Sequence, residues 1–189
     1  NNNYRYSDLG FYYLARVVRQ VSGQRIDDYV RDRFYSPMGL FNIGFNPRSN
    51  FSLNRIPPSE MDNYWRKQKV HGYVHDMGAA MLGGVSGHAG LFGNAHDLAI
   101  LGQLWLQRGI YGNQVYLKPD VVREFSSRFP NATRRGLGFD MKQLNSKRSQ
   151  NVSSLASPKV FGHLGFTGTC IWTDPAEELV YVFLSNRTY

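Results

Sequence analysis

The sequence predicts an α+β fold in which helices come first along the chain and antiparallel strands come last. Apolar residues recur at helical spacing before Gly136, whereas short β-branched and aromatic runs follow it. Residues 174–177, Asp-Pro-Ala-Glu, separate two of these runs and predict a hairpin turn. The chain has 189 residues, of which 42% are apolar and 14% aromatic. This composition excludes intrinsic disorder and is sufficient for one domain with a core.

Four helices are expected in the first part of the chain. The first has Ser7 as its N-cap and ends at Gly23. The second covers residues 26–34 and ends before a proline. The third begins at Asn94, with an aspartate three residues later, and the fourth covers residues 119–126 with proline in its first turn.

The strands expected after Gly136 cover residues 138–141, 159–163, 167–173 and 179–184. They make a thin sheet, and the first helix has no strand before it to pack against. We therefore expect residues 1–189 to be the later part of a larger domain, with residues 1–135 mainly helical and loop and residues 136–189 holding the strands. Apolar surface beside the first helix and the hairpin is expected to be uncovered.

Residues 41–75 are polar and irregular, and they include Pro47, Pro57 and Pro58. So long a stretch without a helical or strand pattern is unusual in a compact domain. It predicts either a functional border or a segment that packs against something else.

The net charge of +8 does not predict a nucleic-acid partner. Residues 1–95 and residues 96–189 each hold 11 basic and 7 acidic residues, so the excess is spread evenly. Basic residues cluster only between Arg128 and Arg148, where no aromatic residues alternate with them, and a solvated basic loop is expected. A polyanionic polymer of the cell envelope stays open as a partner. No apolar run is long enough to predict a membrane span.

No metal or other cofactor is expected. His71 and His75 have the spacing of a helical metal site, but Gly72 disfavours a helix there. Cys170 is the single cysteine, which excludes an internal disulfide, and it is expected to be a small buried residue. The glycines between residues 84 and 93 lack the lysine of a phosphate loop and predict tight turns around a cleft.

Two short segments carry residue types suited to acyl transfer. Tyr6 stands at the entrance of the first helix, where a tyrosine can act as a general base if nearby cations lower its pKa from about 10. Gly165 lies two residues after His163. A glycine at this position lets a substrate backbone approach the strand closely, and a backbone N–H can then face an oxyanion. Taken singly, Tyr6 could be a packed aromatic residue and His163 an ordinary strand histidine.

Together these segments resemble the class C β-lactamase, D,D-peptidase and esterase superfamily, the penicillin-recognising serine hydrolases. Tyr6-Ser7-Asp8 resembles the Tyr-x-Asn motif, and His163-Leu164-Gly165 resembles the His-x-Gly form of the Lys-Thr-Gly motif. Residues 82–92, Leu-Gly-Gly-Val-Ser-Gly-His-Ala-Gly-Leu-Phe, are similar to a glycine-rich segment of that superfamily. Residues 183–187 resemble its last central strand. The resemblance covers nearly the whole chain and implies a β-lactamase/transpeptidase-like fold.

The chain departs from this superfamily at two positions. The nucleophile motif Ser-x-x-Lys is missing, because no lysine of the chain has a serine three residues before it. We expect this motif upstream, in an N-terminal segment of the same protein, and expect the chain alone to be inactive. Asp8 replaces the asparagine of the Tyr-x-Asn motif and can only accept hydrogen bonds when ionised. This replacement disfavours β-lactam hydrolysis more than ester or peptide hydrolysis.

The resemblance implies acyl transfer by the upstream serine, with its lysine and Tyr6 moving the proton. His163 would support the site electrostatically, the Phe166 N–H would complete the oxyanion hole, and Asp8 and Gly165 would contact the substrate. The implied setting is the bacterial periplasm or cell envelope, and the implied substrates are peptidoglycan stem peptides, β-lactams or small esters.

A non-catalytic module that binds cell-wall fragments is the alternative, and fusion to a glycoside hydrolase domain stays open. If the site assignment is right, the Tyr6 hydroxyl and the His163 ring line one cleft.

Overall fold

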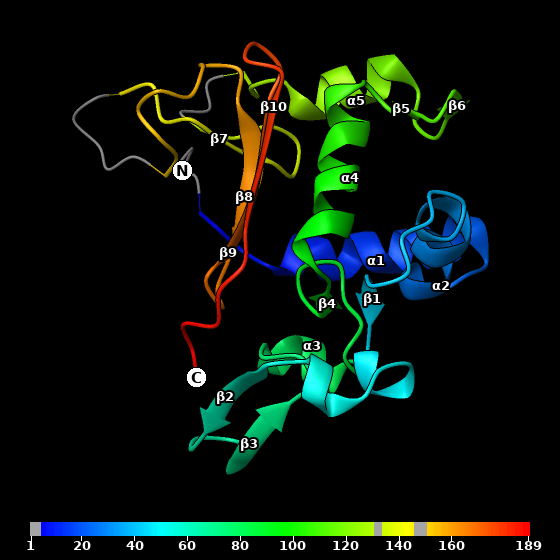
Figure 1. Ribbon diagram of the computed structural model, residues 1–189, viewed down its shortest axis with the longest axis vertical. Coiled ribbons are helices and arrows are strands. Elements are labelled where there is room, and N and C mark those ends of the chain that lie inside the picture. The colour runs from blue at the N-terminus through cyan, green and yellow to red at the C-terminus, as the bar shows by residue number, and fades with distance from the viewer. Residues whose placement is uncertain (1–4, 131–133, 146–150) are drawn as a thin grey trace. The chain divides into compact units, whose positions relative to one another are not determined.

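The computed structural model describes residues 5–130, 134–145 and 151–189 (Figure 1). It comprises two compact units, and each is described by itself. The first unit contains residues 1–93 together with Thr188 and Tyr189, and the second contains residues 94–187. The Thr188 hydroxyl donates to the Ser59 carbonyl at 2.6 Å, which attaches the last residues to the first unit.

The first unit contains three α-helices. Helix α1 spans Leu9–Ser22, α2 spans Ile26–Val30 and continues as a π-helix, η1, over Arg31–Tyr35, and α3 spans Met77–Met81. Helix α1 ends as expected at Gly23, whose φ of 74° places it in the left-handed region. The expected N-cap is wrong by one residue. Asp8 is the N-cap and makes no side-chain cap, because the Ser7 hydroxyl accepts the Leu9 N–H instead, at 3.3 Å.

Residues 41–75 are more regular than expected. Strand β1, Gly44–Phe45, pairs with β4, Leu91–Phe92, and β2, Pro58–Asp62, forms an antiparallel hairpin with β3, Gln68–His71. Two 3-10 turns, η2 over Pro47–Ser49 and η3 over Leu53–Arg55, connect them. Pro58 is tolerated because it is the first residue of its strand. No apolar alternation marks this hairpin, so the sequence pattern does not predict it.

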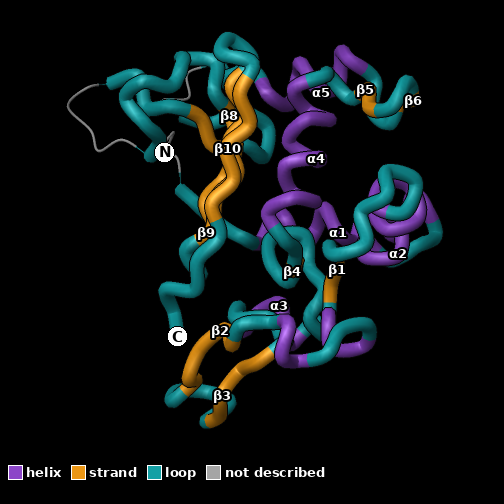
Figure 2. The backbone as a smooth tube through the Cα atoms, in the orientation of Figure 1, coloured by secondary structure: helices purple, strands orange, loops and turns teal. Residues whose placement is uncertain are grey.

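The second unit is a four-stranded antiparallel sheet with a helix on one face (Figures 1 and 2). Its strands follow the order β10-β9-β8-β7. The sheet strands are β7 (Asp140–Met141), β8 (Phe161–Gly165), β9 (Thr169–Asp174) and β10 (Leu179–Phe183). The remaining elements are α4 (Ala95–Leu106), β5 (Ile110–Tyr111), β6 (Gln114–Val115) and α5 (Pro119–Ser126). The expected strands and the two expected helices of this unit are therefore present, with ends shifted by a few residues.

Helix α4 packs against β9 and β10. The Asn94 side chain caps it by accepting the Asp97 N–H at 2.7 Å, as expected. A Cβ atom at Gly102 would collide with Val180 of β10, so glycine allows the close approach of helix and sheet. Leu104 and Phe161 are almost fully buried and form the centre of this core.

The turn between β9 and β10 is the expected hairpin. Asp174 pairs with Leu179 across it, which leaves residues 175–178 as the connection. The buried Asp174 carboxylate accepts the backbone N–H groups of Ser157 at 2.7 Å and of Ala176 at 3.2 Å. The same carboxylate therefore shapes the turn and holds the segment before β8.

The basic stretch between Arg128 and Arg148 is built into the fold, contrary to the expected solvated loop. Arg134 and Arg135 flank the buried carboxylate of Asp140 at 3.3 and 3.5 Å. Arg128 donates to the Lys142 carbonyl at 3.0 Å. The described residues of this stretch pack into the fold because a buried carboxylate needs charged or hydrogen-bonding partners. Lys147 and Arg148 lie outside the described residues.

Apolar side chains are exposed beside the first helix and the hairpin, as expected. No residue of α1 is buried, and the stripe formed by Leu9, Tyr13, Val17 and Val21 is between 53% and 82% exposed. In the second unit, every second side chain of β10 is half exposed: Leu179, Tyr181 and Phe183.

Candidate active-site segments

The Tyr6-Ser7-Asp8 segment is displayed at the entrance of α1. The Tyr6 side chain is 55% exposed, so it is not the packed aromatic residue of the ordinary alternative. The Asp8 carbonyl accepts the N–H groups of Phe11 at 2.9 Å and Tyr12 at 3.3 Å, which starts the helix. Its carboxylate does not cap the helix. The Ser7 side chain thus helps to start the helix, whereas the Asp8 carboxylate is not used to cap it.

A hydrogen-bonded chain in the glycine-rich segment lies against α1. The Ser86 hydroxyl is 2.9 Å from His88 Nδ1, and His88 Nε2 is 2.8 Å from Asp76 Oδ1. Asp76 also caps α3 by accepting the Ala79 N–H at 2.7 Å. The His88 ring meets the Tyr12 ring edge to face, with centroids 4.5 Å apart. The chain therefore connects α3, the glycine-rich segment and the second turn of α1.

The residue types of this chain, Ser86, His88 and Asp76, are those of a catalytic triad. A substrate, however, has no access to the serine. Ser86 is 3% exposed and the His88 side chain is 6% exposed, so a substrate carbonyl cannot reach the hydroxyl. Burial raises the pKa of Asp76, but hydrogen bonds from the Ala79 N–H and from His88 lower it overall. The carboxylate therefore stays ionised and orients the imidazole. These three residues hold the segment in place.

Tyr12 is not an alternative general base. Burial, followed by the negative charges of Asp76 and Asp8, raises the pKa of its hydroxyl. The phenol is therefore protonated at neutral pH. No sequence pattern predicts this arrangement, although Asp76, Ser86 and His88 lie within 13 consecutive residues (76–88) of the glycine-rich region.

Glycines bring the glycine-rich segment close to α1. A Cβ atom at Gly87 would collide with the Phe11 carbonyl oxygen, and one at Gly78 would collide with the Tyr12 hydroxyl. Gly90 has a φ of 109°, which a residue with a side chain rarely adopts. Gly87 lies in a bend of the expected glycine-rich turns, and Gly78 and Gly87 allow close packing against α1.

His163 lies in the half of β8 that has one strand partner. Strand β7 pairs only with Phe161 and Gly162, so in the described part of the chain residues 163–165 are bonded to β9 alone. The half-exposed His163 ring has Nδ1 2.8 Å from the Leu164 carbonyl. A Cβ atom at Gly165 would collide with the Thr169 hydroxyl, so a larger residue here would require that side chain to move. The Gly165 carbonyl accepts the Gly168 N–H at 3.0 Å and closes the turn.

Arg187 holds the turn that contains Phe166. Its Nε donates to the Phe166 carbonyl at 2.7 Å, and its guanidinium lies 4.9 Å from the centroid of the Phe166 ring. The Arg187 N–H also donates to the Thr167 carbonyl at 3.1 Å. The Phe166 ring itself is 68% exposed. Arg187 therefore fixes the orientation of the peptide groups after β8, a role that sequence analysis did not assign to it.

The expected site residues lie in two different units. Tyr6 and Asp8 belong to the first unit, and His163, Gly165 and Phe166 belong to the second. Within each unit they are adjacent and accessible. That the Tyr6 hydroxyl and the His163 ring line one cleft stays a prediction.

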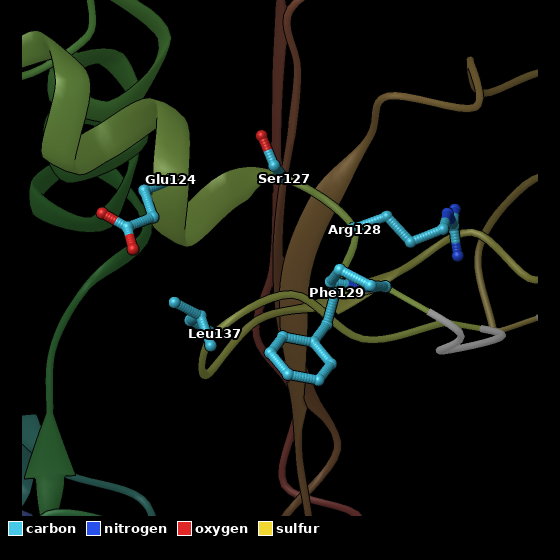
Figure 3. A pocket seen from close by; sticks show the side chains of 6 residues that line it. Glu124, Ser127, Arg128, Phe129 and Leu137 are labelled. Carbon is cyan, nitrogen blue, oxygen red and sulfur yellow. The ribbon is translucent and has the colours of Figure 1, made fainter.

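A cavity in the second unit, His71, His75 and Cys170 do not provide a second candidate for the active site. The cavity, of about 260 Å³, is lined by Glu124, Ser127, Arg128, Phe129, Pro130 and Leu137, and Figure 3 shows the Arg128 side chain directed away from Leu137. His71 Nε2 lies 2.6 Å from the Ile56 carbonyl, and His75 Nε2 lies 3.3 Å from Glu60. Among the residues that the structure describes, no group of three histidine, cysteine or carboxylate side chains could hold a metal. Cys170 is half exposed, and burial raises its pKa, so the thiol is a weak nucleophile.

The chain is similar to known proteins over its whole length. A family model described as Beta-lactamase matches residues 1–189. Proteins named "Putative D-alanyl-D-alanine carboxypeptidase" from Salmonella gallinarum and Salmonella schwarzengrund are 35% identical over 196 residues, covering 97% of this chain and 45% of theirs. The chain thus spans less than half the length of these relatives.

Solved structures show the same fold at low sequence identity. A β-lactamase from Mycobacterium bovis aligns over 97% of this chain and 57% of its own, with a TM-score of 0.65 and 21% identity. An octameric penicillin-binding protein homologue from Pyrococcus abyssi aligns over 100% and 40%, with a TM-score of 0.67 and 16% identity. The expected β-lactamase/transpeptidase-like α+β fold is confirmed. In the described ranges, no helix has both the length and the hydropathy needed to cross a bilayer.

Proposed function

The chain belongs to the β-lactamase family of penicillin-recognising serine hydrolases, and from this we propose that it is the later part of an acyl-transfer enzyme. The observation that carries the proposal is the display of Tyr6 at the entrance of α1. The Tyr6 residue is 55% exposed, and the start of α1 is held by the contact of Tyr12 with His88, which is hydrogen-bonded to Asp76. A general base must be accessible and must be held in position.

In the proposed mechanism the nucleophile is a serine of a Ser-x-x-Lys motif in a preceding segment of the same protein. It attacks the carbonyl carbon of an amide, ester or β-lactam, while its lysine and Tyr6 take up the proton. Tyr6 then returns the proton to the leaving nitrogen or oxygen. Water attacks the acyl-enzyme in the second half of the reaction and releases the serine.

The strand residues complete the proposed site. The open half of β8 admits the substrate alongside Gly165, and the Phe166 N–H donates to the oxyanion. His163 supports the developing negative charge electrostatically. Arg187 fixes the turn that carries Phe166. Asp8 accepts a hydrogen bond from a substrate amide, which favours peptides over β-lactams.

The proposed substrates are peptides of the bacterial cell wall that end in D-alanine. The name of the Salmonella relatives supports this class. The proposed place of action is the periplasm or another part of the cell envelope, and the proposed role is cell-wall turnover.

Because the 189 residues contain no Ser-x-x-Lys motif, we propose that the chain alone does not turn substrate over. The same observation favours a second candidate, a non-catalytic module that binds cell-wall fragments. The presence of a Ser-x-x-Lys motif elsewhere in the protein would distinguish the enzyme from the binding module, because acyl transfer requires a nucleophile.

The test uses the intact protein and two readouts: covalent labelling by a fluorescent penicillin and release of D-alanine from a pentapeptide. Tyr6→Phe and His163→Ala are each expected to lower turnover by about 10²–10⁴-fold. Tyr13→Phe, an exposed tyrosine of the same helix, and His96→Ala, an exposed histidine of α4, are the matched controls and should retain turnover. Equal turnover in Tyr6→Phe and Tyr13→Phe would remove Tyr6 from the mechanism.

A further inference from the structure

The turn of the β2–β3 hairpin exposes an unusual set of side chains. Tyr64 is 84% exposed, Met61 52% and Trp65 44%. Two lysines, Lys67 and Lys69, are also exposed. We call residues 61–69 the β2–β3 tip. Figure 1 shows this turn at the end of the hairpin that is remote from α3.

A buried carboxylate holds the β2–β3 tip in one conformation. Asp62 is 2% exposed and accepts the backbone N–H groups of Tyr64 at 3.0 Å, Trp65 at 2.8 Å and Arg66 at 3.0 Å. Such a turn is fixed before any partner arrives. Its backbone therefore loses little conformational freedom on binding.

Arg66 anchors the turn to the rest of the first unit. Its side chain is 10% exposed and pairs with Asp62 at 2.7 Å and with Glu60 at 2.6 Å. It also donates to the carbonyls of Val74 and His75, both at 2.7 Å. Burying three charges costs desolvation energy, and the result is an ordered turn whose aromatic residues face solvent.

The outer face of the β2–β3 tip is positively charged. Glu60 and Asp62 both pair with Arg66 inside the hairpin, and its single charge balances one of the two carboxylates. With Lys67 and Lys69 included, residues 60–69 carry a net charge of +1, and the two lysines are on the outside. Lys67 and Lys69 form no ion pair within the described ranges, and both are exposed. The tip thus combines an apolar methionine, two amphipathic aromatic rings and two unpaired cations.

We propose that the β2–β3 tip docks on the surface of a bilayer containing anionic phospholipids. Tyrosine and tryptophan side chains favour the headgroup region, where the ring is buried and its polar atom stays hydrated. Lys67 and Lys69 face the phosphate groups of the anionic lipids. The tip lies on the surface and does not cross it. This inference does not depend on the proposed acyl transfer.

Charge complementarity favours a membrane over a glycan strand as the partner. A sugar ring stacks on an aromatic face and takes hydrogen bonds from adjacent polar side chains. Here one face of Trp65 lies against the Arg66 guanidinium, 5.3 Å from the ring centroid, and is not free to stack on a sugar ring. Asn63 and Gln68 are exposed polar side chains of the tip, but the two unpaired lysines favour an anionic surface over a neutral glycan.

The test measures sedimentation of the 189-residue chain with vesicles of phosphatidylglycerol and phosphatidylcholine, and with phosphatidylcholine alone. Binding is expected only to the anionic vesicles and is expected to weaken with added salt. Tyr64→Ser/Trp65→Ser and Lys67→Asn/Lys69→Gln should each lower the affinity by about tenfold or more. Asparagine is chosen at position 67 because the φ of Lys67 is 49°, which asparagine tolerates.

Matched variants control for the other exposed surfaces. Tyr13→Ser/Val21→Ser removes two exposed apolar side chains of α1, and Lys118→Gln/Lys159→Gln removes two exposed lysines of the second unit. Both should bind anionic vesicles like the parent chain. Circular dichroism checks that every variant is folded. As a second readout, the blue shift of tryptophan fluorescence on binding should disappear with Trp65.

Three outcomes would overturn the proposal. One is equal binding to vesicles with and without anionic lipid. Another is loss of binding in the α1 variant but not in the tip variants, which would assign binding to the exposed stripe of α1. The third is sedimentation with cell-wall glycan but not with vesicles.

Discussion

At the scale of single residues, the buried carboxylate of Asp62 should make the stability of the first unit depend on pH. The Arg66 guanidinium, followed by the Trp65 N–H, holds the pKa of Asp62 well below its usual range. Because the pKa is lower in the folded state than in the unfolded chain, this carboxylate stabilises the fold fully above the ordinary pKa of aspartate, about 4. Its contribution decreases as the pH falls below that value and is fully lost only below the pKa of the folded state. We expect Asp62→Asn to lower the urea midpoint at pH 7, and to lower it less at pH 3.

Asp28 supplies the control for this experiment. It also pairs with an arginine, Arg31, but its side chain is 42% exposed. Asp28→Asn should therefore change the urea midpoint little at either pH. A midpoint of Asp62→Asn equal to that of Asp28→Asn would show that the buried network does not stabilise the first unit.

A second residue-scale prediction concerns the approach of the glycine-rich segment to α1. Gly87→Ala places a methyl group against the Phe11 carbonyl oxygen and should destabilise the fold by about 1–3 kcal/mol. Gly10→Ala, inside α1 with no atom within 4 Å of the new methyl group, should be neutral or stabilise by up to about 1 kcal/mol. Urea unfolding measures both. The prediction is wrong if the two variants have the same stability.

At the scale of elements, the contact between α4 and the sheet should dominate the stability of the second unit. Leu104 of α4 is 1% exposed, and Leu104→Ala should cost about 2–5 kcal/mol. Leu155, which is 90% exposed, is the matched leucine, and Leu155→Ala should change stability by less than about 0.5 kcal/mol. A small effect of Leu104→Ala on the thermal midpoint would contradict this account of the core.

Elements also differ in how far the sequence predicts them. The N-cap Asn94, the first-turn Pro119 and the turn at residues 174–177 act on their nearest neighbours, so α4, α5 and the β9–β10 hairpin were predictable. The β2–β3 hairpin was not predictable from the sequence. It is held by a buried ionic network, whereas a predictable strand shows an apolar stripe.

At the scale of the whole molecule, the exposed apolar surfaces predict self-association. The α1 stripe and the outer face of β10 are uncovered in this chain. Large exposed apolar patches usually bind a partner or aggregate. We expect the isolated chain to associate with rising concentration in sedimentation velocity. Co-expression with the proposed segment that holds Ser-x-x-Lys is expected to suppress this association. A monodisperse monomer that unfolds cooperatively at high temperature would contradict the prediction.

The sequence by itself determined the family, the α+β class and most helices and strands of this protein. Motifs such as Tyr6-Ser7-Asp8 and His163-Leu164-Gly165, and caps and turns, depend on residues that are neighbours in the chain. The tertiary structure alone decided the polar arrangements that include a buried side chain: Asp62 with Arg66, Asp76 with His88 and Ser86, and Asp140 with Arg134 and Arg135. It also decided that Arg187 holds the turn after β8. The physical reason is that a polar side chain becomes a structural element only when folding removes its water and brings a partner to it, and neither event leaves a periodic pattern in the sequence.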